Sequence, residues 1–338
     1  MWRERVSQSW LNSAVFALAL ALMWPGAGAQ PAPKAIRVGV LLSGSEAQWA
    51  PLEQALVSGL RERGYVEGGN LTLVRRYGEL QGAKIRGYAA ELGSLNVDAI
   101  VTSCTTTTRE AARAAPNTPV VMGSLNDPVG AGLVASFARP GGNITGRGGL
   151  GLELVPKRLE VLRTLLPESA RADARIAVMM NAKDPAHEAA WQAAEPAARA
   201  LKLTLVRIEA SGPAGVAAAI ESLGRADAKA LLVFSDDPTM IEFRAPIAAA
   251  AIRLGLPAIS GPRLFAESGM LISYGADMAD DYRLSAGHVV KVANGVSPST
   301  LPIEQPTQFP MTINMKTAAA LKIKIPSELL IRADTVIQ

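Results

Sequence analysis

The sequence predicts an α/β protein built from two doubly wound parallel-sheet lobes, joined by a hinge that the chain crosses several times. Continuous apolar runs rich in β-branched residues alternate with amphipathic helical segments, as in parallel sheets covered by helices. The same order of units, β-α-β-α-β-α-β, occurs twice, in residues 36–146 and 148–261. The chain has 338 residues, which is more than one typical hydrophobic core contains. These observations favour two similar lobes.

The first 29 residues have the pattern of a secretory signal peptide. Arg3 and Arg5 precede the apolar run LNSAVFALALALMW, and a small-residue triplet, A-G-A, ends at Ala29. The apolar run is shorter than the roughly 20 residues of a membrane-spanning helix, which argues against a membrane anchor. We expect cleavage after Ala29, a mature chain that begins at Gln30, and a periplasmic location.

The composition limits the classes of function. Cys104 is the only cysteine and has no histidine near it in sequence, so neither a disulfide nor a nucleophile is assigned. The two histidines, His187 and His288, lie far apart, and neither metal-ligand spacing nor a phosphate-binding GxxxxGK[ST] motif is visible. The net charge is +4, but the basic residues are scattered along the chain and aromatic residues are few, which argues against nucleic-acid binding. We therefore expect a monomer with no metal, no cofactor and no nucleic-acid partner.

The first lobe begins with a strand at residues 35–43, a continuous apolar run that a parallel sheet would bury. The helix that follows, residues 51–64, has apolar residues at helical spacing and ends at Gly64. Further units alternate in the same way. They are strands at residues 71–77, 97–103 and 118–124, and helices at residues 83–95 and 106–115.

The second lobe repeats this plan after a helix at residues 154–167. Its strand LTLVRIEA at residues 203–210 mirrors LTLVRRY at residues 71–77 of the first lobe. One internal proline, Pro196, interrupts the helical pattern of residues 185–202. The other expected elements are strands at residues 174–181, 229–235 and 256–261, and helices at residues 216–226 and 239–255.

The last 77 residues, positions 262 to 338, are too few for a third doubly wound lobe. They contain a strand at residues 270–275, a helix at residues 279–295 and shorter elements. We expect this tail to return to lobe 1 and then to lobe 2. The predicted lobe 1 is residues 36–146 plus 270–306, and the predicted lobe 2 is residues 148–269 plus 307–338.

The candidate site lies in the loops after the carboxyl ends of the strands, where parallel sheets bind ligands. The sharpest loop is Ser103-Cys104-Thr105-Thr106, because hydroxyls and the N–H groups of a helix N-terminus suit a carboxylate or a phosphate. Helix capping explains the same residue types equally well. The predicted ligand-binding residues are Ser43, Ser45, Trp49, Ser103, Cys104, Thr105, Thr106, Asn126, Asp127, Asn181, Asp236, Gly261 and Tyr274.

Asp127 and the pair Asp236-Asp237 each come before a proline at a predicted helix start. They would cap helices, hold a ligand ammonium across a cleft, or act as the acid and base of a glycosidase. Trp49 and Tyr274 lie near strand-end loops, where their rings would stack on a ligand. The sequence leaves these roles open.

Four stretches of the sequence carry a family resemblance. They are DPVGAGLVASFARPGGNITG (127–146), VPKRLEVLRTLLP (155–167), GMLISYGADMADDYRLSAGHVVKVANG (269–295) and LPIEQPTQFPMTINMKTAAALKIKIPSELLIRADTVIQ (301–338). They resemble the ABC-transporter substrate-binding proteins whose best-known members bind tryptophan or tyrosine. The resemblance extends over about residues 36–338 and implies a type I periplasmic-binding-protein fold with three hinge crossings and a ligand in the cleft. It also implies an ABC permease as partner.

The first of these stretches has glycine-rich turns on both sides of the apolar run GLVASF, residues 132–137. In the light of the resemblance we expect a short helix there, ended by Gly141 or Gly142 with positive φ. Residues 143–146 would be the first crossing strand, since glycines beside a hinge let a few torsions absorb lobe closure.

The expected function is capture of a small solute between the lobes and its delivery to an ABC importer. The solute would be an amino acid, aromatic ones included, or a related carboxylate, and no reaction is expected. Two alternatives come from other classes. One is a secreted α/β enzyme that uses Asp127 or Asp236, and the other is a ligand-sensing receptor for a signalling partner.

Overall fold

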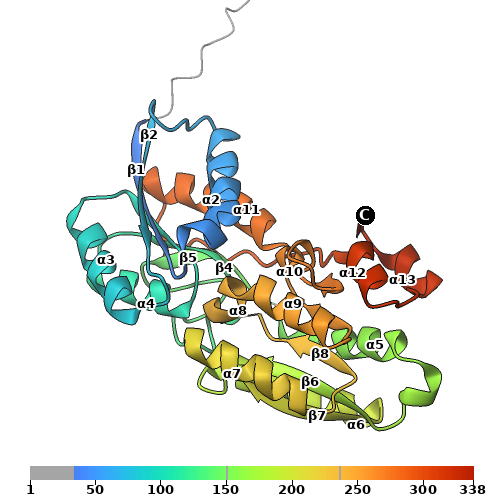
Figure 1. Ribbon diagram of the computed structural model, residues 1–338. Helices are drawn as coiled ribbons and strands as arrows, with labels where there is room; N and C mark the ends of the chain where they lie inside the picture. Colours follow the sequence, from blue (N-terminus) through green and yellow to red (C-terminus); the bar gives the residue numbers. More distant parts are fainter. Residues whose placement is uncertain (1–33, 150, 236) are drawn as a thin grey trace, which may run out of the picture. The chain divides into compact units, whose positions relative to one another are not determined.

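The computed structural model describes residues 34–149, 151–235 and 237–338. The chain divides into residues 1–34 and one compact unit, residues 35–338. The predicted signal peptide lies outside the described residues. The compact unit contains two separate sheets, each surrounded by helices (Figure 1). We call the part around the first sheet lobe 1 and the part around the second sheet lobe 2.

Lobe 1 has a five-stranded sheet in the order β2-β1-β3-β4-β5, and every pairing is parallel. All residues of β1 except Arg37 are buried, as expected for a strand covered on both faces. Helix α11 packs beside α2, while α3 packs beside α4. The elements are β1 (Ile36–Leu42), α2 (Glu46–Arg61), β2 (Leu71–Tyr77), α3 (Gly82–Ser94), β3 (Ala99–Thr102), α4 (Thr105–Ala114), β4 (Val120–Leu125), β5 (Ile144–Gly148) and α11 (Met278–Ala293).

Lobe 2 has a seven-stranded sheet in the order β12-β11-β10-β9-β8-β6-β7. Its strands β7-β6-β8-β9-β10 repeat the order of lobe 1, and β11 is antiparallel to β10. The strands are β6 (Ala174–Met180), β7 (Leu203–Glu209), β8 (Ala230–Val233), β9 (Ala258–Ser260), β10 (Ile272–Tyr274), β11 (Met311–Asn314) and β12 (Thr335–Ile337). The helices are η1 (Leu152–Leu154), α5 (Val155–Leu165), η2 (Glu168–Ala170), α6 (Pro185–Ala200), α7 (Gly212–Arg225), α8 (Pro238–Glu242), α9 (Arg244–Arg253), α10 (Arg263–Glu267), α12 (Met315–Ala320) and α13 (Ser327–Arg332).

The predicted fold class, two parallel-sheet α/β lobes, is confirmed. Strand β10 corrects one boundary, because the prediction placed residues 270–306 in lobe 1. The strand instead pairs with β9 in parallel and with β11 antiparallel, so it belongs to the second sheet. Its residues Ile272 and Ser273 are fully buried there. Of the predicted segment 270–306, helix α11 does belong to lobe 1, where it packs on α2 and β4.

Two predicted helices differ from the structure. The helix expected over residues 239–255 is split into α8 and α9 at Phe243, whose φ of −101° and ψ of 19° are not helical. The short helix expected at residues 132–137 is a series of turns. There the Asp127 carboxylate accepts from the N–H of Gly130, and Gly132 has a φ of 67°, which interrupts helical hydrogen bonding. Gly141 has the predicted positive φ, 86°, although no helix ends there.

The chain passes between the two sheets three times: after β5, after β10 and before β11. Strand β5 pairs with β4 along most of its length, so residues 143–146 lie in lobe 1 and the first crossing begins only after Gly148. Just before the third crossing, the backbone of Glu304 pairs with β5 in parallel. Its N–H donates to the Gly146 carbonyl at 3.0 Å, and its carbonyl accepts from the Gly148 N–H at 3.1 Å.

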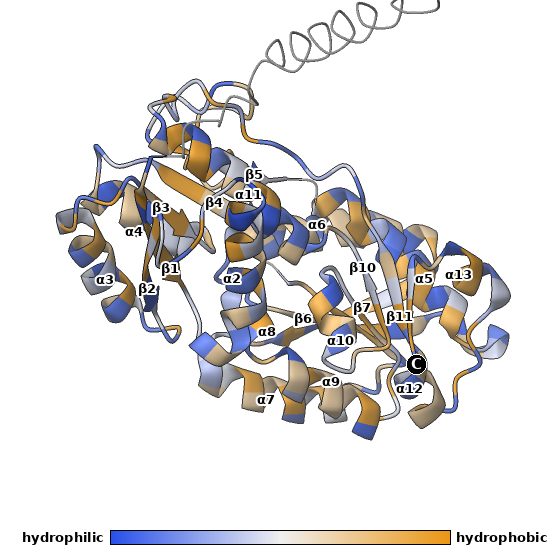
Figure 2. Ribbon diagram, turned by 90° about the horizontal axis from the view of Figure 1, so that it is seen from above, coloured by the Kyte–Doolittle hydropathy of each residue, from blue (hydrophilic) through white to orange (hydrophobic). Residues whose placement is uncertain are grey.

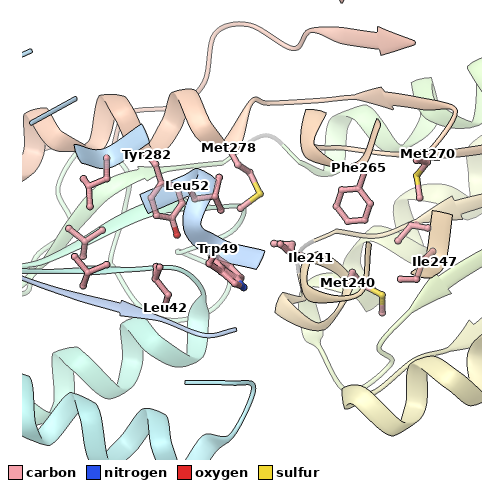
Figure 3. Packing of buried hydrophobic residues seen from close by; sticks show 14 of the residues in the cluster. Leu42, Trp49, Leu52, Met240, Ile241, Ile247, Phe265, Met270, Met278 and Tyr282 are labelled. Carbon is pink, nitrogen blue, oxygen red and sulfur yellow. The ribbon is translucent and has the colours of Figure 1, made fainter. Parts of the chain in front are cut away.

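Buried apolar residues continue from one lobe into the other. The helices around both sheets carry hydrophobic residues interspersed with hydrophilic ones, which suits helices that bury one face (Figure 2). Where the lobes meet, Trp49 of α2, Ile241 of α8 and Met278 of α11 belong to one buried cluster (Figure 3). The lobes therefore share part of a core beside the hinge.

Candidate ligand-binding site

A cavity of about 610 Å³ is lined by residues of both lobes. Its walls come from loops at the carboxyl ends of the strands, as expected for a doubly wound sheet. Eight predicted ligand-binding residues line it: Ser103, Cys104, Thr105, Thr106, Asn126, Asp127, Asn181 and Gly261. The polar or charged lining residues that the site prediction did not include are Arg109, Ser124, Arg158, Lys183, Asp184, Ser235 and Asp237.

The loop after β3 forms a central part of the lobe 1 wall. Its Ser103 hydroxyl accepts from the Ser43 N–H at 2.9 Å and bonds to the Ser43 hydroxyl at 3.1 Å. Thr107 stabilises the start of α4, because its Oγ1 accepts from the N–H groups of Ser103 and Cys104. These internal bonds hold the loop while Thr105 and Thr106 line the cavity. Since α4 begins at Thr105, the positive end of its dipole lies at this wall.

The loop after β4 completes the lobe 1 wall. Asp127 caps a turn, not a helix, since its Oδ1 accepts from the Gly130 N–H at 2.8 Å. The Asn126 side chain lies against Gly151 at the first crossing, where a Cβ would come within 2.6 Å of the Asn126 carboxamide. A larger residue at position 151 would therefore displace Asn126 from its place.

The lobe 2 wall is organised around a carboxylate and an imidazole. Asp237 caps α8 by accepting from the Thr239 N–H at 2.6 Å, and its other oxygen accepts from Asn181 Nδ2 at 2.6 Å. Behind them lies the fully buried ring of His187, the third residue of α6, whose N-cap is Asp184. Its Nδ1 lies 2.9 Å from the Asn181 N–H and its Nε2 lies 3.2 Å from the Asp237 N–H. A neutral imidazole accepts at one nitrogen only, so one of these bonds forms at a time.

Arg158 of α5 is the buried cation of the cavity wall. Only 6% of its surface is exposed, and its Nε donates to the Tyr274 carbonyl at 2.8 Å. Two glycines make room for its guanidinium. A Cβ on Gly261 would lie 2.8 Å from Arg158 Nη2, and one on Gly275 would lie 2.9 Å from it. Ser235 Oγ lies on the same side, 3.1 Å from the Gly261 Cβ position.

A polar contact joins the lobes beside the cavity. Glu242, the last residue of α8, accepts from the Ser45 N–H at 3.0 Å and from the Ser45 hydroxyl at 2.6 Å. It thereby supplies a negative charge to the N-terminus of α2, which Ser45 does not cap with its own side chain. Arg244 adds a longer bond, from its Nη2 to the Gln48 carbonyl at 3.3 Å.

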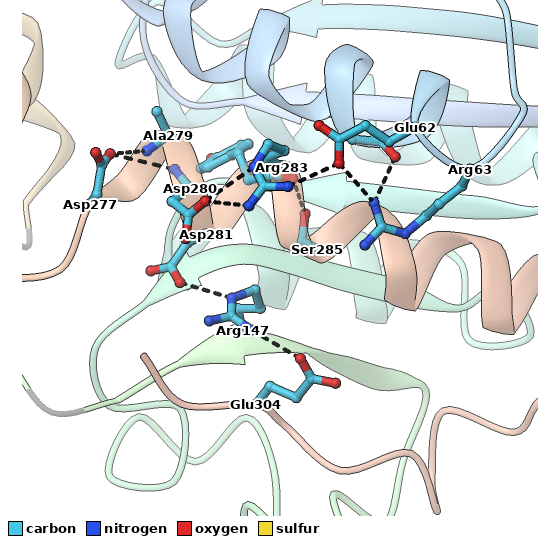
Figure 4. Close-up of polar contacts among 12 residues, drawn as sticks. Glu62, Arg63, Arg147, Asp277, Ala279, Asp280, Asp281, Arg283, Ser285 and Glu304 are labelled. Atoms are coloured by element: carbon cyan, nitrogen blue, oxygen red, sulfur yellow. Dashed lines mark hydrogen bonds and ion pairs between the residues drawn. The ribbon is translucent and has the colours of Figure 1, made fainter. Parts of the chain in front are cut away.

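A buried ion pair connects β5, the last strand before the first crossing, to the lobe 1 wall (Figure 4). Arg147 of β5 donates to Asp281 of α11 at 2.8 Å, and both side chains are buried. The other Asp281 oxygen accepts from the hydroxyl of Ser124, which lines the cavity. Burial raises the pKa of the Asp281 carboxyl above its ordinary 3.8, and Arg147 offsets only part of this rise. Arg147 also contacts the half-exposed Glu304 at 3.0 Å.

Four predicted site residues lie away from the cavity lining. Ser43 is behind the wall, where it holds Ser103, and Ser45 contacts Glu242 between the lobes. Trp49 has no exposed surface and packs in the shared core, and Tyr274 packs on the lobe 2 core and supports Arg158 through its carbonyl. Asp236, the remaining prediction, lies outside the described residues.

Within residues 34–149, 151–235 and 237–338, no three or more His, Cys, Asp or Glu side chains gather as metal ligands would. The helices in the same ranges are too short or too polar to cross a bilayer.

Residues 36–337 match the family model described as ABC transporter substrate binding protein. A related protein, the tyrosine-binding protein of Clostridioides difficile (strain R20291), is 24% identical over 274 residues, which are 80% of this chain and 76% of that protein.

Solved structures show the same fold. A conserved domain protein from Vibrio cholerae O1 biovar El Tor has a TM-score of 0.81 at 25% identity, over 90% of this chain and 100% of that one. An ABC domain from Streptococcus pneumonia in complex with L-Trp also has a TM-score of 0.81, at 22% identity and with the same coverage. A ligand-free, open substrate-binding protein with adhesive properties from Clostridium difficile has a TM-score of 0.63 at 21% identity, over 90% of this chain and 100% of that one.

Proposed function

Because the chain belongs to the ABC transporter substrate binding protein family, we propose that it captures an amino acid or a related carboxylate between its two lobes and delivers it to an ABC importer. One observation carries the proposal: a cavity of about 610 Å³ is lined by strand-end loops of both lobes. A ligand that touches both walls binds best when the lobes approach, so binding and lobe closure are coupled.

The ligand class follows from the donors in the walls and from the relatives. Arg158, Arg109 and Lys183 line the cavity together with the hydroxyls of Thr105 and Thr106. Such groups suit a carboxylate. One relative is named a tyrosine-binding protein and one similar structure holds L-Trp, which supports an amino acid as the ligand of this chain.

The proposal includes a route and a partner. Residues 1–29 would direct the chain to the periplasm, where the protein would act as a monomer and pass its solute to a membrane permease. N-terminal sequencing of the periplasmic fraction should find Gln30 first. A chain that keeps Met1 would contradict the signal-peptide assignment.

A thermal-shift screen of amino acids, keto acids, small carboxylates and sugars tests the proposed function. A ligand present at about 100 times its Kd should stabilise the protein by about 2.7 kcal/mol. Calorimetric titration then gives the Kd, and recovery of the ligand after incubation shows whether it is unchanged. Conversion of the ligand would favour an enzyme, and the absence of any binding solute would contradict the proposal.

Asp127 offers a control within the screen. Its carboxylate holds the Gly130 N–H, and asparagine can make the same bond. If the ligand ammonium binds elsewhere, Asp127→Asn should leave the Kd within about threefold, less than 1 kcal/mol. A loss of about 2–5 kcal/mol would instead place a ligand cation at Asp127.

A further inference from the structure

Ser124 joins the cavity wall to a buried carboxylate. It lies near the end of β4 and lines the cavity, and its hydroxyl donates to Asp281 Oδ2 at 2.9 Å. The other Asp281 oxygen accepts from Arg147 Nε at 2.8 Å (Figure 4). Only 3% of the surface of Asp281 and 6% of that of Arg147 is exposed, so the pair behind Ser124 is shielded from water.

The pair with Arg147 decides which group supplies the proton in the bond between Ser124 and Asp281. A guanidinium is always charged and only donates, so the carboxylate beside it is the ionised partner and accepts at both oxygens. The Ser124 hydroxyl has a single proton, which it donates to Asp281. Toward a ligand, the Ser124 oxygen can then only accept a hydrogen bond.

The carboxylate also makes Ser124 a stronger acceptor. A hydroxyl that donates to an ionised group is polarised, and successive hydrogen bonds strengthen one another where water is excluded. A donor that carries a positive charge gains most from such an oxygen. An ammonium group therefore suits this position better than a hydroxyl, and a carbonyl oxygen there would face lone pairs.

Hydrogen-bond donors lie at the neighbouring strand end. Thr105 and Thr106 line the cavity at the start of α4, shortly after β3. Strands β3 and β4 are parallel neighbours, and adjacent strands of a sheet lie about 4.7–4.9 Å apart. Their ends therefore place donors for a carboxylate close to an acceptor for an ammonium, which suits a ligand with both groups on one carbon atom.

We propose that Ser124 accepts a hydrogen bond from the ammonium group of an α-amino acid, and that Asp281 is the positioning residue that fixes Ser124 in this role. The inference rests on the proposed function and narrows its ligand class from carboxylates in general to those with an adjacent ammonium group. It places the ammonium at Ser124 and not at Asp127, so Asp127→Asn should leave the Kd within about threefold.

The first experiment is calorimetric titration with ligands that differ only in the group on the α-carbon. The series is built on whichever of the twenty L-amino acids gives the largest thermal shift. For leucine it is L-leucine, 2-hydroxy-4-methylpentanoate and 4-methyl-2-oxopentanoate, and for tyrosine it is L-tyrosine, 4-hydroxyphenyllactate and 4-hydroxyphenylpyruvate. The amino acid should bind at least about 30-fold more tightly than the oxo acid, with the hydroxy acid between them.

The outcomes of this series separate the inference from the proposed function. Equal or tighter binding of the oxo acid would overturn the inference. So would a screen in which keto acids, other carboxylates or sugars bind and no amino acid does, although capture of a solute would then still stand. If no solute binds at all, the proposed function itself fails.

The second experiment removes the acceptor with Ser124→Ala. Affinity for the amino acid should fall about 30-fold, whereas affinity for the matching oxo acid should stay within about threefold, so the preference for the amino acid is lost. Urea denaturation of the same variant measures the effect on stability separately. An unchanged preference, or equal losses for both ligands, would overturn the assignment of Ser124.

The third experiment tests the positioning role with Asp281→Asn. Because Arg147 donates to one side-chain oxygen at position 281, asparagine keeps its oxygen there and turns its NH2 group toward Ser124. Ser124 then accepts that bond, and its own proton is free for a ligand. The preference for the amino acid should fall at least about tenfold, and the oxo acid should bind more tightly than it binds the unmodified protein. A structural role alone would weaken both ligands alike, and that result would overturn the positioning role.

Glu304→Gln is the matched control, since Glu304 also contacts Arg147 but does not line the cavity. Its preference for the amino acid over the oxo acid should stay within about twofold of the unmodified protein. A change as large as that of Asp281→Asn would overturn the role of Asp281. Where Asp281→Asn does not fold, Ser124→Ala and the ligand series decide the proposal.

Discussion

In lobe 1 the loop that faces the cavity is held by hydroxyl groups, whereas in lobe 2 the corresponding loops are held by an imidazole and a carboxylate. In lobe 1, Ser103 and Thr107 make these bonds. Their partners lie within a few positions along the chain, except Ser43, which is 60 positions from Ser103. In lobe 2, His187 and Asp237 connect loops that are 50 residues apart. Two lobes with the same strand order therefore stabilise equivalent walls with different chemistry.

This difference has a consequence for stability. A loop held by hydroxyl groups depends on weak bonds, and the loss of one of them costs about 1 kcal/mol. In lobe 1 a buried ion pair, Arg147 with Asp281, also holds β5 against α11. Lobe 2 relies on His187, whose ring lies between two strand ends. Substitutions at these two places should have unequal effects.

The largest effect is expected from Arg147→Met. The substitution leaves the buried Asp281 carboxylate with the Ser124 hydroxyl as its remaining side-chain partner among the described residues, and an uncompensated buried charge costs about 3–5 kcal/mol. Because burial already raises the pKa of Asp281, the carboxyl can take up a proton, so we expect the lower end, about 3 kcal/mol, at neutral pH. Urea denaturation measures this loss.

Glu304→Gln is the matched control, because Glu304 also contacts Arg147 but is half exposed. Its loss should cost less than about 1 kcal/mol. Similar losses in both variants would show that the pair with Asp281 has no special weight in lobe 1.

The second effect is expected from His187→Phe in lobe 2. Phenylalanine preserves an aromatic ring next to Phe234 but cannot accept from the Asn181 or Asp237 N–H. A buried donor without a partner costs about 1–3 kcal/mol, and ligand affinity should fall because Asn181 lines the cavity. His187→Gln keeps an acceptor and should lose less in both measurements. Unchanged affinity in His187→Phe would contradict a positioning role for the imidazole.

The same contrast explains what could be predicted from the sequence. Residues 103–106 could be placed at the cavity from the sequence because they are contiguous and follow a recognisable strand. The sequence analysis did not place Arg158 at the cavity, because an arginine on an amphipathic helix is expected to face solvent. Its burial depends on Gly261 and Gly275, about 100 positions later in the chain. No local pattern contains that information.

The fold could be predicted for a similar reason. Hydrophobic periodicity and the doubled order of units are local features, and they gave both lobes. The assignment of β10 to the wrong lobe came from strand pairing, which is non-local and leaves no periodic trace. The interlobe contact of Ser45 with Glu242 was missed because the partners are 197 positions apart.

A third prediction tests the contact that joins the lobes. Glu242→Ala removes the acceptor of two bonds from Ser45, and charge-assisted bonds of this kind at a partly exposed position contribute about 1–2 kcal/mol in total. If the contact belongs to the ligand-bound arrangement, Kd should rise about tenfold. Ser45→Ala removes only the hydroxyl bond and should have the smaller effect. An unchanged Kd in Glu242→Ala would show that the contact does not favour binding.

A fourth prediction concerns the pH dependence of lobe 1, where His288 of α11 is buried. Burial lowers its pKa below the ordinary 6.5, although Glu304 and the Pro302 carbonyl act in the opposite direction, and Lys291 and Arg147 add to the lowering. The unfolded chain therefore binds a proton more readily than the folded one below pH 6.5. The contribution of His288 is present above that pH and is lost as the pH falls through the lower, folded pKa. His288→Gln should remove this dependence in urea denaturation at stepped pH, and an unaltered profile would contradict it.

The smallest effect is expected from Cys104→Ser. Cys104 is the N-cap of α4, is 6% exposed, and its Sγ lies 3.5 Å from Thr107 Oγ1. Serine is a better N-cap than a thiol and is smaller, so the fold should be kept and the Kd should stay within about tenfold, ~1.4 kcal/mol. Calorimetric titration beside urea denaturation checks both. Complete loss of binding with unchanged stability would mean that the thiol itself is required, and lobe 1's wall would then depend on more than its hydroxyls.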